Sequence, residues 1–311
     1  MPGSTPLTVN GRMPFWALGT AMLERLRNLL PRQKTNPRDC VMVVGLGAMK
    51  SGTSWLSGYL RSIPNFLHSP VKEMNVFNMF CDNPNRHRDE RFRLLRMDQI
   101  LLRPRPFDQP EAVDRLRALA QIAHINDPEA YLAYFAERLN GHTHFGEISP
   151  SYSHLSLDTL KLMSGLTRDV RFLFLMRDPA RRAASHIRHV RSRTRPDVPI
   201  DVFLAEIEPG RDIWLRSDYG GTLDRLEQAG LADKTRVMTY ETLFKDETMQ
   251  GLCDWLGLPF RKPRPDRVVN QGRSDELTQA QHDQLRERLD PIYADLARRD
   301  LPAGAERWRW T

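Results

Sequence analysis

The chain has 311 residues, of which 40% are hydrophobic, so it can bury a substantial core. No run of about 18 uncharged apolar residues is present, which argues against a membrane-spanning helix. The net charge of +7 favours an anionic partner, but the arginines are dispersed among acids and no helix-turn-helix, zinc or aromatic RNA-binding motif is present, so nucleic acid is not expected. Three widely spaced cysteines form no disulfide or metal pattern, so we expect a cytoplasmic setting.

Residues 1–36 are predicted to form an N-terminal extension with one amphipathic helix. Apolar side chains from Phe15 to Leu30 fall largely on one helical face, and arginines lie elsewhere. The order of regions that marks a signal peptide is not found here. Such a helix either packs on its own domain or lies on an anionic membrane surface, as a peripheral contact at the inner face of a membrane.

Residues 37–311 are predicted to form one domain in which strands alternate with helices. Short apolar runs at residues 41–46 and 170–176 predict strands, the segment KTRVMTYETL at residues 234–243 is a third candidate, and a helical pattern follows each of them. We therefore predict an α/β fold of three layers, P-loop-like, with a central parallel sheet flanked by helices. Residues 83–126 are rich in arginine, proline and aspartate, and are either a lid on the acceptor side or a solvated insertion without a role.

The segment GLGAMKSGTSWL joins the first predicted strand to the first helix. Its glycines let the backbone approach an anion, and the helix N-terminus offers unpaired N–H groups. Lys50 adds a positive charge, and Ser51, Thr53 and Ser54 add hydroxyl donors. A nucleotide triphosphatase would carry a glycine where Met49 stands, and no strand supplies a convincing aspartate for Mg²⁺. The loop predicts an anion site without a metal; a P-loop kinase-like phosphoryl transferase that uses ATP is the alternative.

The segment FLMRDPARRAASHI is a second candidate for phosphate binding. It places Arg177 at the end of a predicted strand, where open α/β sheets bind their ligands. Ser185 follows about two turns into the next helix, which Pro179 begins. An arginine and a helix serine in this order could clamp a phosphate, but the same letters also describe an ordinary turn with the serine facing solvent.

Together the two segments resemble the sulfotransferases that use 3′-phosphoadenosine 5′-phosphosulfate (PAPS), in which they form the 5′-phosphosulfate loop and the 3′-phosphate motif. Two later segments, VKEMNVFN and GEISPSY, resemble the heparan sulfate and related carbohydrate branch, of which the chain looks like a bacterial-type member. RVMTYETLFKDE followed by WLGLPF resembles the late strand and helix of the family, and VVNQGRS resembles its C-terminal Gly-Arg, which closes over the cofactor. The match covers roughly residues 40–275. It implies direct in-line transfer of the sulfuryl group from PAPS to an acceptor hydroxyl, without a metal and with release of adenosine 3′,5′-bisphosphate.

The resemblance implies a role for each matching residue. Lys50 would contact the oxygen that bridges phosphate and sulfate, and would offset charge on the leaving phosphate. Arg177 and Ser185 would hold the 3′-phosphate. The 5′-phosphate would be cradled by Ser51, Gly52, Thr53 and Ser54. Further cofactor contacts would come from Tyr240, Gly272 and Arg273. The tyrosine is equally compatible with a core position in its strand.

Glu73 matches the glutamate that acts as the base in the carbohydrate branch, where it would take the proton of the attacking acceptor. A carboxylate needs burial or a like charge to raise its pKa toward neutrality. The alternative is that Glu73 forms an ion pair with Lys72 or Lys50. His68 lies nearby but outside the histidine motif of the cytosolic branch, so we expect a structural role for it.

Three positions depart from the carbohydrate branch on the acceptor side. Asn75 stands where that branch has histidine, Asn78 where it often has an acid, and Ile148 where it has lysine. Glu147 and Tyr152 remain as polar groups that are either catalytic or structural. The acceptor is therefore left open among a saccharide, a glycolipid or lipid head group, and a small metabolite.

Overall fold

The structure is a computed structural model that describes residues 35–80, 110–264 and 277–308. Five strands form one sheet in the order β2-β3-β1-β4-β5, and every neighbouring pair is parallel. The strands are β1 (Val41–Gly47), β2 (Phe66–His68), β3 (His144–Ile148), β4 (Asp169–Met176) and β5 (Thr235–Thr239). The three predicted strands are confirmed as β1, β4 and β5, whereas β2 and β3 were not predicted.

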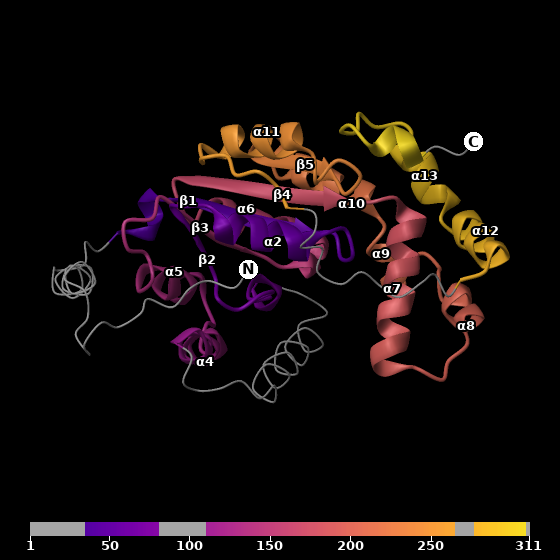
Figure 1. Ribbon diagram of the computed structural model, residues 1–311, viewed down its shortest axis with the longest axis horizontal. Coiled ribbons are helices and arrows are strands. Elements are labelled where there is room, and N and C mark those ends of the chain that lie inside the picture. Colours follow the sequence, from indigo (N-terminus) through magenta and orange to yellow (C-terminus); the bar gives the residue numbers. More distant parts are fainter. Residues whose placement is uncertain (1–34, 81–109, 265–276, 309–311) are drawn as a thin grey trace, which may run out of the picture.

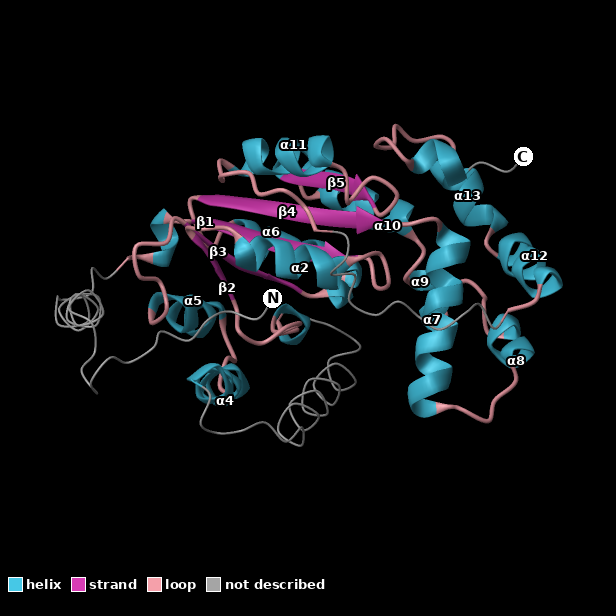
Figure 2. Ribbon diagram, in the orientation of Figure 1, coloured by secondary structure: helices cyan, strands magenta, loops and turns pink. Residues whose placement is uncertain are grey.

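Helices cover both faces of the sheet, which gives the predicted three layers (Figures 1 and 2). One face carries α2 (Thr53–Ser62) and α11 (Asp246–Leu256), whose apolar side chains pack on Val43, Leu173 and Met238. The other face packs Met42, Phe172 and neighbouring apolar side chains against α5 (Pro128–Ala136), α6 (Leu157–Ser164) and α10 (Tyr219–Gln228). Strand residues alternate between the two clusters because successive side chains of a strand point to opposite faces.

The remaining helices lie around these layers. They are α4 (Pro110–Ala123), α7 (Pro179–Thr194), α8 (Ile200–Ala205), α9 (Asp212–Leu215), α12 (Gln279–Arg288) and α13 (Asp290–Leu296). Within α4, Leu119 and Ile122 are buried in the larger core cluster, so this part of the predicted insertion packs into the domain. The rest of that insertion, from 83 to 109, lies outside the described residues, as does nearly all of the N-terminal extension. None of the helices described is both long and apolar enough to cross a membrane.

The parallel topology gathers the candidate site segments that the structure describes at one edge of the sheet. Because the strands run the same way, their carboxyl ends meet at this edge, where open α/β sheets bind ligands. The segments that leave these ends are residues 48–52, 69–76, 149–152, 177–178 and 240–245. Helix α7 begins at the same edge and runs away from the sheet (Figure 1). Its N-terminus is capped by Asp178, whose carboxylate accepts from the Arg181 amide at 2.8 Å.

Candidate active site

The loop between β1 and α2 is held in a conformation that leaves the N-terminus of the helix open. Lys50 and Gly52 both have left-handed backbones, with φ of 71° and 93°. A Cβ atom on Gly52 would lie 2.9 Å from side-chain carbons of Leu243 and Tyr240, so only glycine fits there. As the N-cap residue, Gly52 has no side chain to accept hydrogen bonds from the first-turn amides of α2. Those amides and the helix dipole therefore favour an anion at this point.

The hydroxyl groups of the loop lie in different surroundings. Ser51 and Thr53 are buried, whereas Ser54 is partly exposed. Ser54 Oγ accepts a hydrogen bond from Lys72 Nζ at 2.5 Å, which links α2 to the segment that follows β2. Sequence reasoning missed this contact.

Positive charge is concentrated around the loop lysine. Burial, and after it the charges of Arg193, Lys72, Arg177 and Arg188, together lower the pKa of Lys50 to about 8. Arg177 Nε is buried without a hydrogen-bond partner among the described residues. A converging set of cations with an unsatisfied buried donor is the arrangement that a polyanionic ligand requires, so the residues present fit such a ligand.

Arg177 lies directly after β4 and contacts two other predicted site residues. Its Nη1 donates to the Lys50 carbonyl oxygen at 3.3 Å. Its guanidinium lies 4.5 Å from the ring centroid of Tyr240, within the range of a cation–π interaction. The Arg177 carbonyl accepts from the hydroxyl of Tyr219 at 2.8 Å, which fixes the backbone at the strand end. Lys50, Arg177 and Tyr240 are thus brought together, and the tyrosine lies at the strand end rather than inside the core.

Ser185 lies two turns into α7 and is partly exposed. Arg188 follows three residues later, so the two side chains share one helical face. The charge of Arg188 is one of those that lower the pKa of Lys50. Gly272 and Arg273, the remaining predicted cofactor contacts, lie outside the described residues.

Glu73 lies in the segment after β2, beside the first turn of α2. Its Oε1 atom is 3.0 Å from Lys72 Nζ, and this same ammonium group bonds Ser54. The ion pair with Lys72, which was the alternative to a catalytic role, is therefore formed. The Lys72 side chain therefore connects the Glu73 carboxylate to Ser54 in the first turn of α2.

His68, by contrast, ties α2 to β2. It is buried, its Nδ1–H donates to the Ser69 carbonyl at 2.8 Å, and its Nε2 accepts from Ser57 Oγ at 2.8 Å. Burial lowers the pKa of His68 to about 4, so the ring is neutral at physiological pH. These contacts are those of the structural histidine that the sequence indicated.

Comparison with known proteins identifies the family to which this fold belongs. The model of the sulfotransferase family matches residues 42–262. The chain belongs to the sulfotransferase family. A sulfotransferase from Alicyclobacillus acidocaldarius has a similar structure, with a TM-score of 0.57 and 22% identity over 88% of this chain and 99% of that one. This likeness supports the fold alone.

Two further solved structures are less similar. The mouse sulfotransferase SULT7A1 complexed with PAP has a TM-score of 0.45 and 13% identity, over 84% of this chain and 89% of that one. The sulfotransferase domain of the Synechococcus PCC 7002 olefin synthase has a TM-score of 0.46 and 18% identity, over 88% of this chain and 100% of that one. A search of curated protein sequences found no match.

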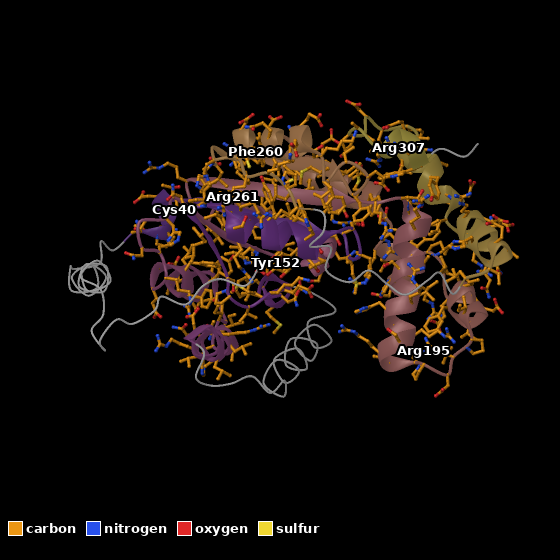
Figure 3. The ribbon with its side chains drawn as sticks, viewed as in Figure 1. Cys40, Tyr152, Arg195, Phe260, Arg261 and Arg307 are labelled. Carbon is orange, nitrogen blue, oxygen red and sulfur yellow. The ribbon has the colours of Figure 1, made fainter. Side chains whose placement is uncertain are left out.

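A buried carboxylate, that of Glu147, joins the segments that follow β2 and β3. Glu147, at the end of β3, accepts hydrogen bonds from Met74 N at 3.0 Å and from Ser149 Oγ and Tyr152 OH at 2.6 Å each. Burial and the charge of Glu73 raise the pKa of Glu147 to about 7, while the three hydrogen bonds oppose the rise. Tyr152 lies in the interior of the domain (Figure 3).

Two of the three positions that depart from the carbohydrate branch, Asn75 and Asn78, belong to the same network, whereas Ile148 is buried in an apolar core cluster. Asn75 Nδ2 donates to the Glu73 carbonyl at 3.0 Å, and Asn75 Oδ1 accepts from Ser151 Oγ at 2.7 Å. Ser151 Oγ in turn accepts from Asn78 Nδ2 at 3.0 Å. Asparagine at these positions therefore replaces charged or imidazole groups with neutral amides that bond locally.

Sequence reasoning also missed Arg188 and Arg193, although both lie on the helix that carries Ser185. Their spacing after Ser185, three and eight residues, was the available signal, since it predicts cations on neighbouring helical faces. No group of three or more histidine, cysteine, aspartate or glutamate side chains that could hold a metal is found among residues 35–80, 110–264 and 277–308.

Proposed function

We propose that this sulfotransferase transfers the sulfuryl group of PAPS to an acceptor hydroxyl. The observation that carries the proposal is the convergence of Lys50, from the loop after β1, with Arg177, from the end of β4, at one edge of the sheet. A loop for a 5′-phosphosulfate and a separate arginine for a 3′-phosphate suit PAPS. ATP has no 3′-phosphate for that arginine.

In this proposal Lys50 stabilises charge that develops on the leaving phosphate when the S–O bond breaks. The first-turn amides of α2 and the hydroxyls of the loop hold the 5′-phosphate. Arg177 and Ser185 hold the 3′-phosphate, and the ring of Tyr240 keeps the Arg177 guanidinium in place. Bound PAPS supplies the activated sulfuryl group.

Glu73 is the proposed base. For this role Lys72 must release the Glu73 carboxylate, and the ammonium group can do so while it keeps its bond to Ser54. The Lys-Glu pair at residues 72–73 and the Glu-x-x-Pro-x-Tyr pattern at 147–152 favour a relation to the carbohydrate branch. The acceptor hydroxyl is proposed to belong to a saccharide, a lipid head group or a small metabolite.

The donor can be tested without knowledge of the acceptor. Adenosine 3′,5′-bisphosphate is expected to raise the melting temperature more than ATP with Mg²⁺ does. A ligand at about 100 times its Kd adds about 2.7 kcal/mol to the free energy of unfolding, so the difference will be measurable. A larger shift with ATP would instead favour the kinase-like alternative. Incubation with ³⁵S-labelled PAPS and fractionated extracts then identifies the fraction that acquires sulfate.

Arg177→Lys is expected to lower affinity for adenosine 3′,5′-bisphosphate by about 10- to 100-fold, because a hydrogen bond to a charged group contributes about 1.5–3 kcal/mol and lysine cannot bind a phosphate in two places. Affinity for AMP, which lacks the 3′-phosphate, should change little. Isothermal titration calorimetry with both nucleotides measures this difference. Arg171→Lys, on the same strand but paired with Asp169, is the matched control. Equal losses for both nucleotides would refute the assignment.

A further inference from the structure

The segment that carries Glu73 has an unusual backbone. Glu73 and Asn75 both have left-handed conformations, with φ of 58° and 54°. Residues with a Cβ atom disfavour this region, and two such residues in a three-residue stretch persist only where the surroundings fix them. The contacts of this segment therefore decide where the Glu73 side chain points.

Three backbone amides of the segment donate to one buried network. Met74 N donates to the Glu147 carboxylate at 3.0 Å. Asn75 N donates to Ser149 Oγ at 3.1 Å, and Phe77 N donates to Tyr152 OH at 3.3 Å.

The two hydroxyls that accept from these amides both donate to the same carboxylate. Ser149 bonds Glu147 Oε2 and Tyr152 bonds Glu147 Oε1, each at 2.6 Å. All three side chains are at most 1% exposed, so water does not compete for these bonds. One carboxylate therefore orients both hydroxyls so that their lone pairs face the backbone of the segment.

We propose that Glu147 is a positioning residue for Glu73, and that it acts through Ser149 and Tyr152 to fix the backbone of residues 73–77. The inference rests on the proposed function, in which Glu73 is the base. It assigns Glu147 a role outside the chemistry, since its carboxylate is buried and committed to the three donors.

The charges around Glu147 are compatible with this role. The titratable groups that face it are Glu73, Tyr152, and Tyr131 and Tyr134 of α5. Burial raises the pKa of each of these tyrosines, so all three stay protonated at neutral pH. They can therefore donate hydrogen bonds but add no charge beside the carboxylate.

The test is Ser149→Ala, with Ser153→Ala as the matched control. Both serines are buried in the segment after β3, and each loses one hydroxyl, but Ser153 Oγ donates to the Pro150 carbonyl and does not touch residues 73–77. Glutamine at 147 is unsuitable because its amide would place a donor against a hydroxyl that already donates. Hydrogen exchange in peptides that cover residues 73–77 is expected to accelerate by about 10-fold or more in Ser149→Ala only.

Turnover provides the second readout. Ser149→Ala should lower kcat by about 10- to 100-fold, since a misplaced catalytic group can cost this much, and should leave the Kd for adenosine 3′,5′-bisphosphate unchanged. The assay uses ³⁵S-labelled PAPS and the extract fraction that accepts label. A purely structural defect would instead weaken binding and turnover together.

Each remaining outcome is decisive. Equal exchange in Ser149→Ala and Ser153→Ala overturns the inference, as does faster exchange with unchanged kcat. If the wild-type protein labels no fraction, the proposed function fails, and with it the catalytic part of this inference, whatever the exchange result.

Discussion

Replacing Lys50 with methionine is expected to lower kcat by about 100- to 1,000-fold, the range found when one preorganised group that stabilises developing charge is removed. Methionine keeps much of the length of the side chain and removes only its charge. Binding of adenosine 3′,5′-bisphosphate should weaken far less, because the helix amides and Arg177 remain. Single-turnover transfer from ³⁵S-labelled PAPS measures the loss of catalytic rate. Calorimetry measures the affinity for adenosine 3′,5′-bisphosphate.

Lys161→Met is the matched control, since it removes the same charge from an exposed position in the last turn of α6. It should retain full activity. If Lys50→Met kept more than about a tenth of the wild-type kcat, the proposed role of Lys50 at the bridging oxygen would be refuted.

The pH dependence of the wild-type protein offers a further check on Lys50. Its pKa is lowered to about 8, so the charged form is present below that pH and lost above it. Because charge is what the proposed role requires, kcat/KM should fall as pH rises through about 8. Bound donor favours the ammonium form, so the corresponding fall in kcat should lie at higher pH. Lys50→Met should lack both limbs.

Glu73→Gln is expected to lower kcat by about 100- to 10,000-fold, the usual contribution of a general base. Glutamine keeps the shape of the side chain and can still accept a hydrogen bond from Lys72, but it cannot take a proton. Affinity for adenosine 3′,5′-bisphosphate should stay near that of the wild type.

A double-mutant cycle with Lys72→Met separates the two roles open to Glu73. If the carboxylate acts only through its ion pair, Glu73→Gln should have no further effect once Lys72 is gone. If it is the base, the substitution should lower kcat by a similar factor in both backgrounds. The first result would remove Glu73 from the mechanism and leave it as an anchor of Lys72.

The parts of the fold that could be predicted are those with a strong local pattern. β1 and β4 are continuous apolar runs because both of their faces are buried, so each strand can be predicted from its own run of residues. β2 has only three residues, and β3 contains His144, Gly146 and Glu147, so neither shows a run or an alternation. β2 and β3 form strands because they pair with segments that are distant in the sequence. A short stretch of sequence does not contain those partners.

The candidate site likewise has residues that could be predicted from the sequence and contacts that could not. Lys50 and Arg177 could be found because each follows a predictable strand at a recognisable spacing. The contact of Lys72 with Ser54 joins residues 18 positions apart through a flexible side chain, and nothing in the letters indicates it. Two hydrogen-bond partners of Glu147, Ser149 and Tyr152, lie close to it in the sequence. The third partner, Met74, lies in the segment that follows β2. Only the assembled sheet edge shows that these groups meet.

The crowding of cations around Lys50 also bears on how long the protein survives in a cell. A fold that holds like charges close together is less stable than it could be, and an anionic ligand relieves that repulsion in the native state alone. Resistance to proteolysis should therefore rise and fall with the supply of the donor nucleotide, as limited proteolysis with and without adenosine 3′,5′-bisphosphate would register.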